Sequence, residues 1–279
     1  MIRPRRSALY MPGANERALE KAKSIPADVL VLDLEDAVAP DAKAAARERV
    51  CALVADRAYG EREVVIRVNA PGTPWHADDL RAVAQAGPSA VLLPKVSTPQ
   101  TVLEVEQALS PGPEIWAMLE TPAAVLAAAQ IAAASERLTV LVLGTNDLAN
   151  ELRAEPVPGR APLLTALSLA LLGARAAGKV ILDGVYNDLK DAAGFEAECV
   201  QGRQLGFDGK TLIHPSQVEP CNRVFAPSAE QVAESREILA AWDEALAEGR
   251  GVATVRGRLV ENLHVANAQR ILAMAEALT

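Results

Sequence analysis

The chain is poor in cysteine. Only three of its 279 residues are cysteines, Cys51, Cys199 and Cys221, and they are far apart, with no CxxC pair. An odd number of widely spaced cysteines argues against a disulfide framework and against a structural zinc site. This usage is typical of a reducing compartment, and we therefore expect a cytoplasmic protein.

The chain also lacks a block of positive charge and a long apolar run. Its formal net charge is −8 and its basic residues cluster only at Arg3, Arg5 and Arg6, which argues against a general nucleic-acid partner. No segment approaches the roughly 18 apolar residues that span a bilayer, and no signal-peptide core follows the first charges. We expect a soluble protein that binds neither nucleic acid nor membrane. The arginine cluster is either a solvated tail or an anion contact, since it stands just before the first predicted strand.

Aromatic residues are scarce as well, at 3%, whereas half of the residues are hydrophobic. Alanine, leucine and valine dominate, which is typical of helices packed on a parallel sheet. Eight short apolar segments alternate with helical ones, and the predicted strands are residues 7–11, 29–34, 64–69, 90–95, 115–120, 138–144, 180–185 and 207–213. Helices are predicted between them, for example over 16–23, 42–55, 77–85 and 99–108.

This alternation predicts an α/β protein with the (β/α)8 TIM-barrel fold, whose functional groups gather where the strands end. A doubly wound open sheet would need a glycine-rich phosphate-binding turn after a strand. The one candidate, Pro12-Gly13-Ala14-Asn15, does not have that pattern. We therefore prefer the barrel.

The character of the chain changes after Pro227. Residues 228–248 predict a long amphipathic helix capped by Ser228, and a final helix ends near Thr279. We therefore divide the chain into a catalytic barrel over residues 1–226 and a C-terminal helical extension over residues 227–279. The extension either covers its own barrel or reaches a neighbouring subunit, and the pattern favours neither.

Two successive strands are followed by carboxylates. IWAML runs into Glu120 before the segment TPAAVLAAAQIAAA, and LTVLVLG is followed by Asp147 within TNDLANEL. Burying a carboxylate at the carboxyl end of a strand costs free energy unless a cation or a hydrogen-bond donor contacts it. Two hard oxygen ligands side by side, with room for water and substrate, are typical of Mg²⁺. The alternative is that Asp147 merely caps its helix.

Other polar residues stand at predicted strand ends: Glu35, Asp36, Arg67, Asn69, Lys95, Asp183 and His214. Several carboxylates near one guanidinium are consistent with a metal that balances part of the negative charge. Arg67 would then bind an anionic substrate group bidentately, or alternatively form a salt bridge with Glu35 or Asp36. For Lys95 we expect a structural ion pair and for His214 a structural hydrogen bond. No segment resembles a nucleophile elbow.

Several motifs together resemble a known family. They are SALYMPG, VLDLEDAVAPDAKAAAR, VIRVN, VLLPKV, MLETPAAV, LGTNDL, GFDGKTLIHPSQV and a tail with VEN. They resemble the citrate lyase β-subunit-like group of the HpcH/HpaI aldolase superfamily, which includes malyl-CoA and citramalyl-CoA lyases. The resemblance extends from about Arg6 to the last helix. It implies a TIM barrel, Mg²⁺ as cofactor, and reversible aldol-type cleavage of a C–C bond in a 3-hydroxyacyl thioester.

The resemblance also implies roles for residues. Glu120 and Asp147 match the family's two Mg²⁺ ligands, and Arg67 matches the arginine that grips the carboxylate of the keto acid. Asn69 is a further substrate-binding candidate from its place at the same strand end, not from the resemblance. Glu35 and Asp36 match acidic residues close to the metal and its waters. The family's N-terminal arm often lies near coenzyme A phosphates, which makes Arg5 and Arg6 candidates for substrate binding.

Family members are often trimers or hexamers, in which the C-terminal segment of a neighbouring subunit caps the site and brings an acidic residue, usually aspartate. Here that position is Glu261, whose carboxylate reaches one methylene farther. A second departure is Thr145-Asn146 before Asp147, where many CoA-lyase members carry Gly-Glu or a similar pair. We expect a homotrimer or homohexamer, with Glu261 as a catalytic candidate.

The function predicted is Mg²⁺-dependent cleavage or formation of a short 3-hydroxyacyl-CoA such as malyl-CoA, β-methylmalyl-CoA or citramalyl-CoA. Three alternatives stay open. They are the β-subunit of a citrate lyase acting on a carrier-protein thioester, a malyl-CoA thioesterase, and a keto-acid-binding homologue without turnover. The acyl group, the keto acid and the direction of the reaction are left undecided by the sequence.

Overall fold

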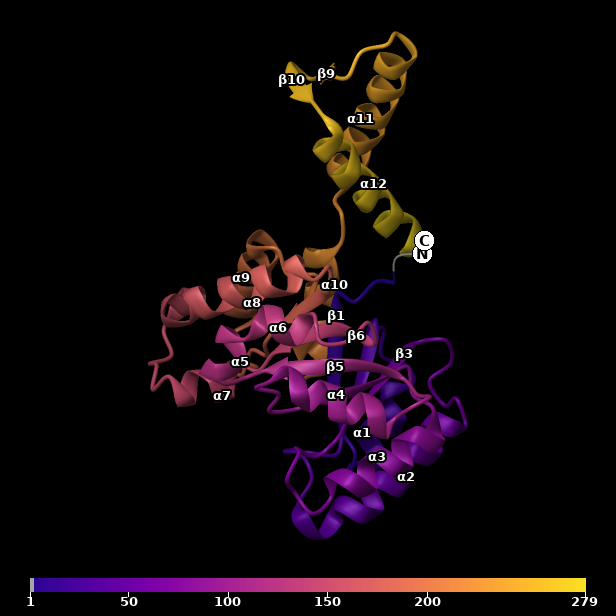
Figure 1. Ribbon diagram of the computed structural model, residues 1–279, viewed down its shortest axis with the longest axis vertical. Helices are drawn as coiled ribbons and strands as arrows, with labels where there is room; N and C mark the ends of the chain where they lie inside the picture. Colours follow the sequence, from indigo (N-terminus) through magenta and orange to yellow (C-terminus); the bar gives the residue numbers. More distant parts are fainter. Residues whose placement is uncertain (1–2) are drawn as a thin grey trace. The chain divides into compact units, whose positions relative to one another are not determined.

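The strands form a closed parallel barrel. In the computed structural model, which describes residues 3–279, eight strands pair in sequence order and β8 closes on β1. Figure 1 shows the ribbon, with β1, β3, β5 and β6 of the barrel labelled. They are β1 (Ser7–Pro12), β2 (Val29–Asp33), β3 (Glu63–Arg67), β4 (Ala90–Leu93), β5 (Glu114–Leu119), β6 (Leu138–Leu143), β7 (Val180–Asp183) and β8 (Gly209–Leu212). Each overlaps its predicted range, and the predicted TIM barrel is confirmed.

Helices connect the strands: α1 (Glu16–Ala22), α2 (Lys43–Ala55), α3 (His76–Ala86), α4 (Pro99–Ala108), α5 (Pro122–Leu126), α6 (Ala128–Ala132), α7 (Thr145–Glu151), α8 (Leu164–Ala176), α9 (Ala192–Leu205) and α10 (Val218–Phe225), with 3-10 turns η1 (Pro40–Ala42), η2 (Pro158–Leu163) and η3 (Pro215–Gln217). The segment after Glu120 forms two short helices because Ala127 leaves helical geometry, at φ −99° and ψ 9°. No helix among residues 3–279 is both long and apolar enough to cross a membrane.

The two faces of the barrel wall carry different side chains. Alternate strand residues point inward, as in any pleated strand, and pack into one interior cluster: Ala8, Val29, Val31, Val65, Ala90, Leu92, Trp116, Met118, Val140, Val142 and Leu182. The same two-residue period continues toward the carboxyl ends of the strands. Asp33, Arg67 and Glu120 therefore also point inward, on the carboxyl-terminal side of this interior cluster.

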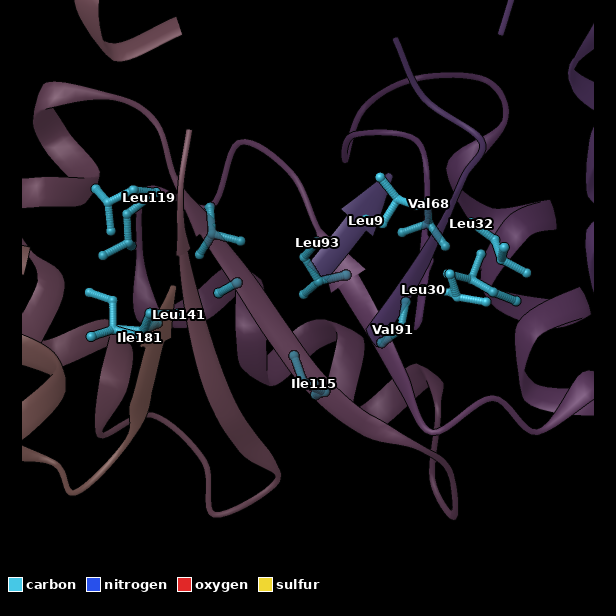
Figure 2. Close-up of a cluster of buried hydrophobic side chains, with 14 of the residues drawn as sticks. Leu9, Leu30, Leu32, Val68, Val91, Leu93, Ile115, Leu119, Leu141 and Ile181 are labelled. Atoms are coloured by element: carbon cyan, nitrogen blue, oxygen red, sulfur yellow. The ribbon is translucent and has the colours of Figure 1, made fainter. Parts of the chain in front are cut away.

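The outward-facing residues make the larger core between strands and helices. Figure 2 shows part of it, with Leu9 of β1, Leu30 and Leu32 of β2, Leu93 of β4 and Ile181 of β7 among the labelled side chains, all of them buried. Apolar residues of the helices, such as Leu19 and Val83, complete this layer. Burial on both sides explains why the strands are continuous apolar runs rather than alternating patterns.

The residues after the barrel make a second compact unit. It comprises Arg3, Pro4 and residues 226–279, whereas residues 5–225 form the barrel unit. Within it α11 (Ala229–Ala247) and α12 (Asn262–Ala277) pack together, and β9 (Ala253–Val255) pairs antiparallel with β10 (Arg258–Val260). The predicted cap of α11 is confirmed, because the Ser228 hydroxyl accepts from the Gln231 N–H at 3.1 Å. A small core around Trp242 holds the unit together.

Trp116 is the largest fully buried side chain of the barrel interior. We predict that Trp116→Ala lowers the free energy of unfolding by about 3–5 kcal/mol, because the truncation leaves a cavity that parallel strands cannot close. Urea denaturation followed by circular dichroism measures the change. Leu172→Ala, at a position that is 68% exposed on α8, is the matched control and should change it by less than about 0.5 kcal/mol. Equal effects of the two substitutions would contradict this account of the interior.

Candidate active site

Polar side chains from several strands line one cavity at the carboxyl end of the barrel. This cavity, called here the metal cavity, has a volume of about 420 Å³. Its wall includes Tyr10, Asp33, Asp36, Arg67, Met118, Glu120, Gly144, Thr145, Asn146, Asp147, Val185 and Thr211. The structure therefore brings together four residues predicted from the sequence, namely Asp36, Arg67, Glu120 and Asp147.

Arg67 is held rigidly in the barrel wall. Its Nε and Nη2 each donate to Asp33, to Oδ1 and Oδ2 respectively, at 2.7 Å. Asp33 in turn accepts from the main-chain N–H groups of Glu35 and Ala37, and the guanidinium lies 4.9 Å from the ring centroid of Tyr10. Burial alone would lower the pKa of Arg67, but the charge of Asp33 raises it above its ordinary value. The guanidinium is thus always charged, with Nη1 as the nitrogen that Asp33 leaves free.

Nη1 of Arg67 faces two further carboxylates. It lies 2.8 Å from Oε2 of Glu35 and 3.5 Å from Oδ2 of Asp36. The sequence left open whether Arg67 pairs with these residues, and it does, although its principal partner is Asp33. Asp36 is largely exposed, with 69% of its side chain accessible, whereas Glu35 is buried.

Burial raises the pKa of Glu35 to about 7. The neighbouring Arg67 opposes this shift, but its charge is already neutralised by Asp33, and the carboxylates of Asp36, Glu120 and Asp33 add repulsion. Glu35 therefore holds or releases a proton near neutral pH, which is the range useful for acid–base chemistry.

Glu120 and Asp147 meet the side chain of Lys95. The main-chain N–H of Lys95 donates to Oε1 of Glu120 at 2.6 Å. The Lys95 ammonium lies 3.7 Å from the same oxygen and forms an ion pair with Oδ2 of Asp147. One cation thus lies between the two carboxylates predicted to bind metal. The structural ion pair expected for Lys95 is present, and its partners are those ligands.

This donor set fits Mg²⁺. Two carboxylates from neighbouring strand ends supply hard oxygen atoms and leave most positions to water and substrate, as Mg²⁺ requires. Glu120 is buried, and burial raises its pKa against the opposing effects of the Lys95 N–H and charge, so that a bound cation would favour its ionised form. Within residues 3–279 no group of three or more metal-ligating side chains occurs, and the pair Glu120 and Asp147 has the oxygen donors that could hold the ion.

Gly144 makes room for Glu120. A Cβ built on Gly144 would lie 2.4 Å from Cβ and 2.5 Å from Oε2 of Glu120. Because the inward-facing position after β6 must therefore lack a side chain, the glycine of LGTNDL allows the carboxylate to stand between β5 and β6.

Asn69 does not reach the metal cavity. Its side-chain amide donates to Oδ2 of Asp79 on α3 at 2.7 Å, and its main-chain oxygen contacts Nδ1 of His76. The prediction that Asn69 binds substrate is thus not supported. Asn69 has the period of the inward-facing Val65 and Arg67, but β3 ends at Arg67, and the Asn69 side chain bonds instead to Asp79 in the first turn of α3.

Arg5 and Arg6 lie at the opposite, amino-terminal end of the barrel. Arg5 donates to both oxygens of Glu63, at 2.8 and 2.7 Å, and lies 5.4 Å from the ring centroid of Trp116. Arg6 pairs with Asp28, just before β2, at 2.8 Å. The prediction that these arginines bind coenzyme A phosphates at the site is corrected, because in this fold they close the bottom of the barrel.

The remaining strand-end residues have structural partners. Asp183 is fully buried between Lys210 and Arg160, whose charges lower its pKa against the effect of burial. His214 bonds through Nδ1 to the hydroxyl and N–H of Ser216, which confirms the expected structural role. Glu261 belongs to the second unit, where it precedes α12 and its N–H donates to Nδ1 of His264. Its catalytic role stays a prediction.

Two residues of the site, Asp33 and Tyr10, were missed from the sequence. Asp33 was read as part of an apolar strand, yet it shares the inward period of Val29 and Val31 and stands level with Arg67 in the register of β2 and β3. Tyr10 has the same period as Ala8, and its hydroxyl lies 3.8 Å from the sulfur of Met118. The two-residue period of the inward-facing strand positions predicts both residues.

Comparison with known proteins agrees with this geometry. A family model described as HpcH/HpaI aldolase/citrate lyase matches residues 6–215, and one described as a C–C bond lyase of the TIM-barrel fold matches residues 163–278. The chain belongs to the HpcH/HpaI aldolase/citrate lyase family. The resemblance stated from the motifs is confirmed.

Within this family, two curated relatives match almost the whole chain. A (3S)-malyl-CoA thioesterase of Cereibacter sphaeroides (strain KD131) is 50% identical over 275 residues, which cover 99% of this chain and 96% of the relative. The citrate lyase subunit beta of Escherichia coli (strain K12) is 38% identical over 284 residues, covering 98% and 94%.

A solved structure is similar over the same length. The CitE protein of Mycobacterium tuberculosis in complex with magnesium, acetoacetate and coenzyme A has a TM-score of 0.79 and 32% identity, covering 97% of both chains. The HpcH/HpaI protein described here is accordingly a Mg²⁺-dependent enzyme of the citrate lyase β-subunit type. The Glu120–Asp147 pair is where its residues can hold the metal.

The raised pKa of Glu35 predicts a pH-dependent stability. The folded protein holds the Glu35 proton up to about pH 7, whereas an unfolded chain releases it near its ordinary pKa of 4.5. The folded state therefore binds more protons in this window, and the free energy of unfolding falls as pH rises through it. Glu35→Gln should remove this fall, on the order of 2 kcal/mol between about pH 5 and pH 8.

The measurement is urea unfolding of metal-free wild type and variant across that pH range. Glu219→Gln, at an exposed position on α10, is the control and should run parallel to wild type. If the Glu35→Gln curve is also parallel to wild type, Glu35 does not titrate as inferred.

Proposed function

We propose that the protein cleaves, or forms, the C–C bond of a short 3-hydroxyacyl-CoA of the malyl-CoA type. The observation that carries this proposal is that Arg67 and the Glu120–Asp147 pair line one cavity of about 420 Å³. An invariably charged guanidinium beside a Mg²⁺ site suits the carboxylate and adjacent oxygen of a 2-oxo or 2-hydroxy acid. These are the groups of the keto-acid half of such a thioester.

In this proposal Arg67 binds and orients the substrate. Asp33 fixes the guanidinium through two bonds, and Nη1, on the remaining side, donates to the substrate carboxylate in place of its contact with Glu35. Because both the position and the charge exist before substrate arrives, the interaction requires no reorganisation during the reaction. When bound by Glu120 and Asp147, Mg²⁺ supplies Lewis-acid polarisation of the substrate oxygen.

Cleavage also needs a base for the hydroxyl proton. Asp36 lines the metal cavity with an exposed carboxylate 3.5 Å from Arg67. We assign it the role of this base. Glu35, which contacts the same Arg67, is the group that exchanges a proton near neutral pH. The electrons of the O–H bond form the carbonyl of the keto acid, the C–C bond breaks, and acetyl-CoA leaves after its enolate is protonated. Glu261 of a neighbouring copy is the other candidate for the base, if the extension caps the site in trans.

A second candidate function is hydrolysis of the same thioester. It is favoured by the 50% identity to proteins named (3S)-malyl-CoA thioesterase. The same groups would position malyl-CoA, and water would take the acyl group, which releases free coenzyme A instead of acetyl-CoA.

The test is an assay of the purified protein with Mg²⁺ and (3S)-malyl-CoA or citramalyl-CoA, following keto acid, acetyl-CoA and free thiol separately. We expect glyoxylate or pyruvate in equal amounts with acetyl-CoA and no free thiol. Arg67→Lys and Glu120→Gln should each lower kcat/KM by about 10²–10³-fold, because each removes preorganised charge. Glu219→Gln is the control and should be fully active.

Other outcomes would contradict the proposal in distinct ways. Free thiol without keto acid would establish the thioesterase. Cleavage only of a carrier-protein thioester would indicate a citrate lyase β-subunit, and keto-acid binding without any turnover would indicate a non-catalytic homologue.

A further inference from the structure

A second cavity adjoins the metal cavity on the side of β6 and β7. Its volume is about 470 Å³, and it extends under α7, η2 and α9. Thr145, Asn146 and Val185 line both cavities. The proposed chemistry of the metal cavity does not use this second space.

The boundary between the cavities is formed by side chains that can move. Asn146 and Asn187 are exposed and pair through their amides, with Nδ2 of Asn187 donating to Oδ1 of Asn146 at 2.7 Å and the reverse bond at 3.3 Å. Because exposed side chains change rotamer rapidly, this boundary is passable without movement of the barrel strands.

The far wall of the second cavity is rigid. It contains Pro156, Pro158 and Pro162, and its backbone passes through left-handed geometry at Gly159 and at Arg160, whose φ is +55°. Left-handed geometry at a non-glycine residue costs roughly 1 kcal/mol or more and persists only where the surroundings hold it. Here the buried Arg160 guanidinium donates to Asp183 at 2.7 Å and to Gln201 at 3.0 Å, and Gln201 donates to the oxygen of Gly159.

The lining of the second cavity is apolar with an acidic rim. Apolar groups come from Ala149, Ala154, Val157, Leu163, Val185 and Ala197. Glu198 is ion-paired with Lys210 at 2.7 Å and Arg160 with Asp183 at 2.7 Å, so these charges cancel in pairs. Three exposed carboxylates, those of Glu155, Asp188 and Asp191, remain on the rim, for a formal balance of −3. Nη2 of Arg160 has no hydrogen-bond partner, but one donor does not offset three carboxylates. The cavity therefore disfavours a second anionic group.

The order of groups around the barrel gives the direction of the substrate. Arg67 stands on β3, Glu120 follows β5 and Asp147 follows β6. In a 2-oxo acid whose carboxylate meets Arg67 and whose C2 oxygen meets the metal ligands, the third substituent of the planar C2 points away from both groups. C3 and the atoms after it therefore extend to the side of β7 and β8, where Val185, after β7, lines both cavities. The Asn146–Asn187 boundary and the second cavity lie next in that direction.

We propose that the second cavity is a subsite for the side chain of the 2-oxo acid, and that it selects an uncharged chain extended beyond C3 against a chain that ends in a carboxylate. This inference rests on the proposed function and names its substrate class. It predicts that pyruvate and longer uncharged 2-oxo acids bind better than oxaloacetate.

Calorimetric titration of the wild-type protein with Mg²⁺ and a series of 2-oxo acids tests the subsite by binding alone. We expect Kd to fall about fourfold for each methylene added from pyruvate to 2-oxobutyrate and 2-oxovalerate, because each enters an apolar space. Oxaloacetate should bind more weakly than pyruvate.

Two variants locate the effect. Ala149→Phe fills the second cavity from α7, and Val157→Trp fills it from the loop before η2; neither residue lines the metal cavity. Each variant should abolish the increase in affinity with chain length of the 2-oxo acid, while leaving the affinity for pyruvate unchanged. Ala45→Phe, at an exposed position on α2, is the matched control and should keep the gain. If Ala149→Phe does not fold, Val157→Trp provides the same test.

The outcomes separate the subsite from the function on which it rests. Pyruvate binding with no gain along the series, tighter binding of oxaloacetate, or a gain that survives both cavity-filling variants would overturn the subsite alone. If no 2-oxo acid binds, pyruvate included, the proposed function fails and the subsite fails with it.

Discussion

The site depends on a shortage of positive charge. Asp33, Glu35 and Glu120 are all buried at the carboxyl end of the barrel, and the buried guanidinium of Arg67 is their common neighbour. Burying carboxylates without equal positive charge is costly. The protein meets this cost in three ways: Asp33 pairs fully with Arg67, Glu35 retains a proton to about pH 7, and Glu120 turns to the Lys95 ammonium and to the metal it is proposed to bind.

This division of charge gives each carboxylate a separate task. Asp33 pairs with Nε and Nη2 of Arg67 and fixes the guanidinium, so that Nη1 is the nitrogen left for a substrate carboxylate. Glu120 and Asp147 stay available for a cation because the Arg67 guanidinium is paired with Asp33. Lys95, in left-handed geometry at φ +56°, brings its main-chain N–H to Glu120 and its ammonium to Glu120 and Asp147.

Much of this could be predicted from the sequence. The apolar strand runs and their regular alternation with helices determine the barrel, and a carboxylate directly after a strand, as at Glu120, must lie at its lip. The errors concern residues that lie outside the strands. Arg5 precedes β1, and a residue before a strand lies at the amino-terminal end of the barrel, away from the site, where it pairs with Glu63. Asn69 lies beyond the end of β3, where the strand period no longer holds, and it bonds to Asp79. Asp33 was missed because the apolar run around it was not divided into inward and outward positions, although Asp33 shares the inward period of Val29 and Val31.

We propose that Glu120 and Asp147 hold a divalent cation, and that the Lys95 ammonium occupies its place in the metal-free protein. The most direct measurement is the affinity of metal-free protein for Mg²⁺, by calorimetry, in wild type, Glu120→Gln and Lys95→Met. We predict one site, weakened at least about tenfold by Glu120→Gln because a ligand charge is lost, and strengthened by Lys95→Met because the competing cation is removed. Equal affinity in wild type and Glu120→Gln, or weaker binding in Lys95→Met, would contradict the claim.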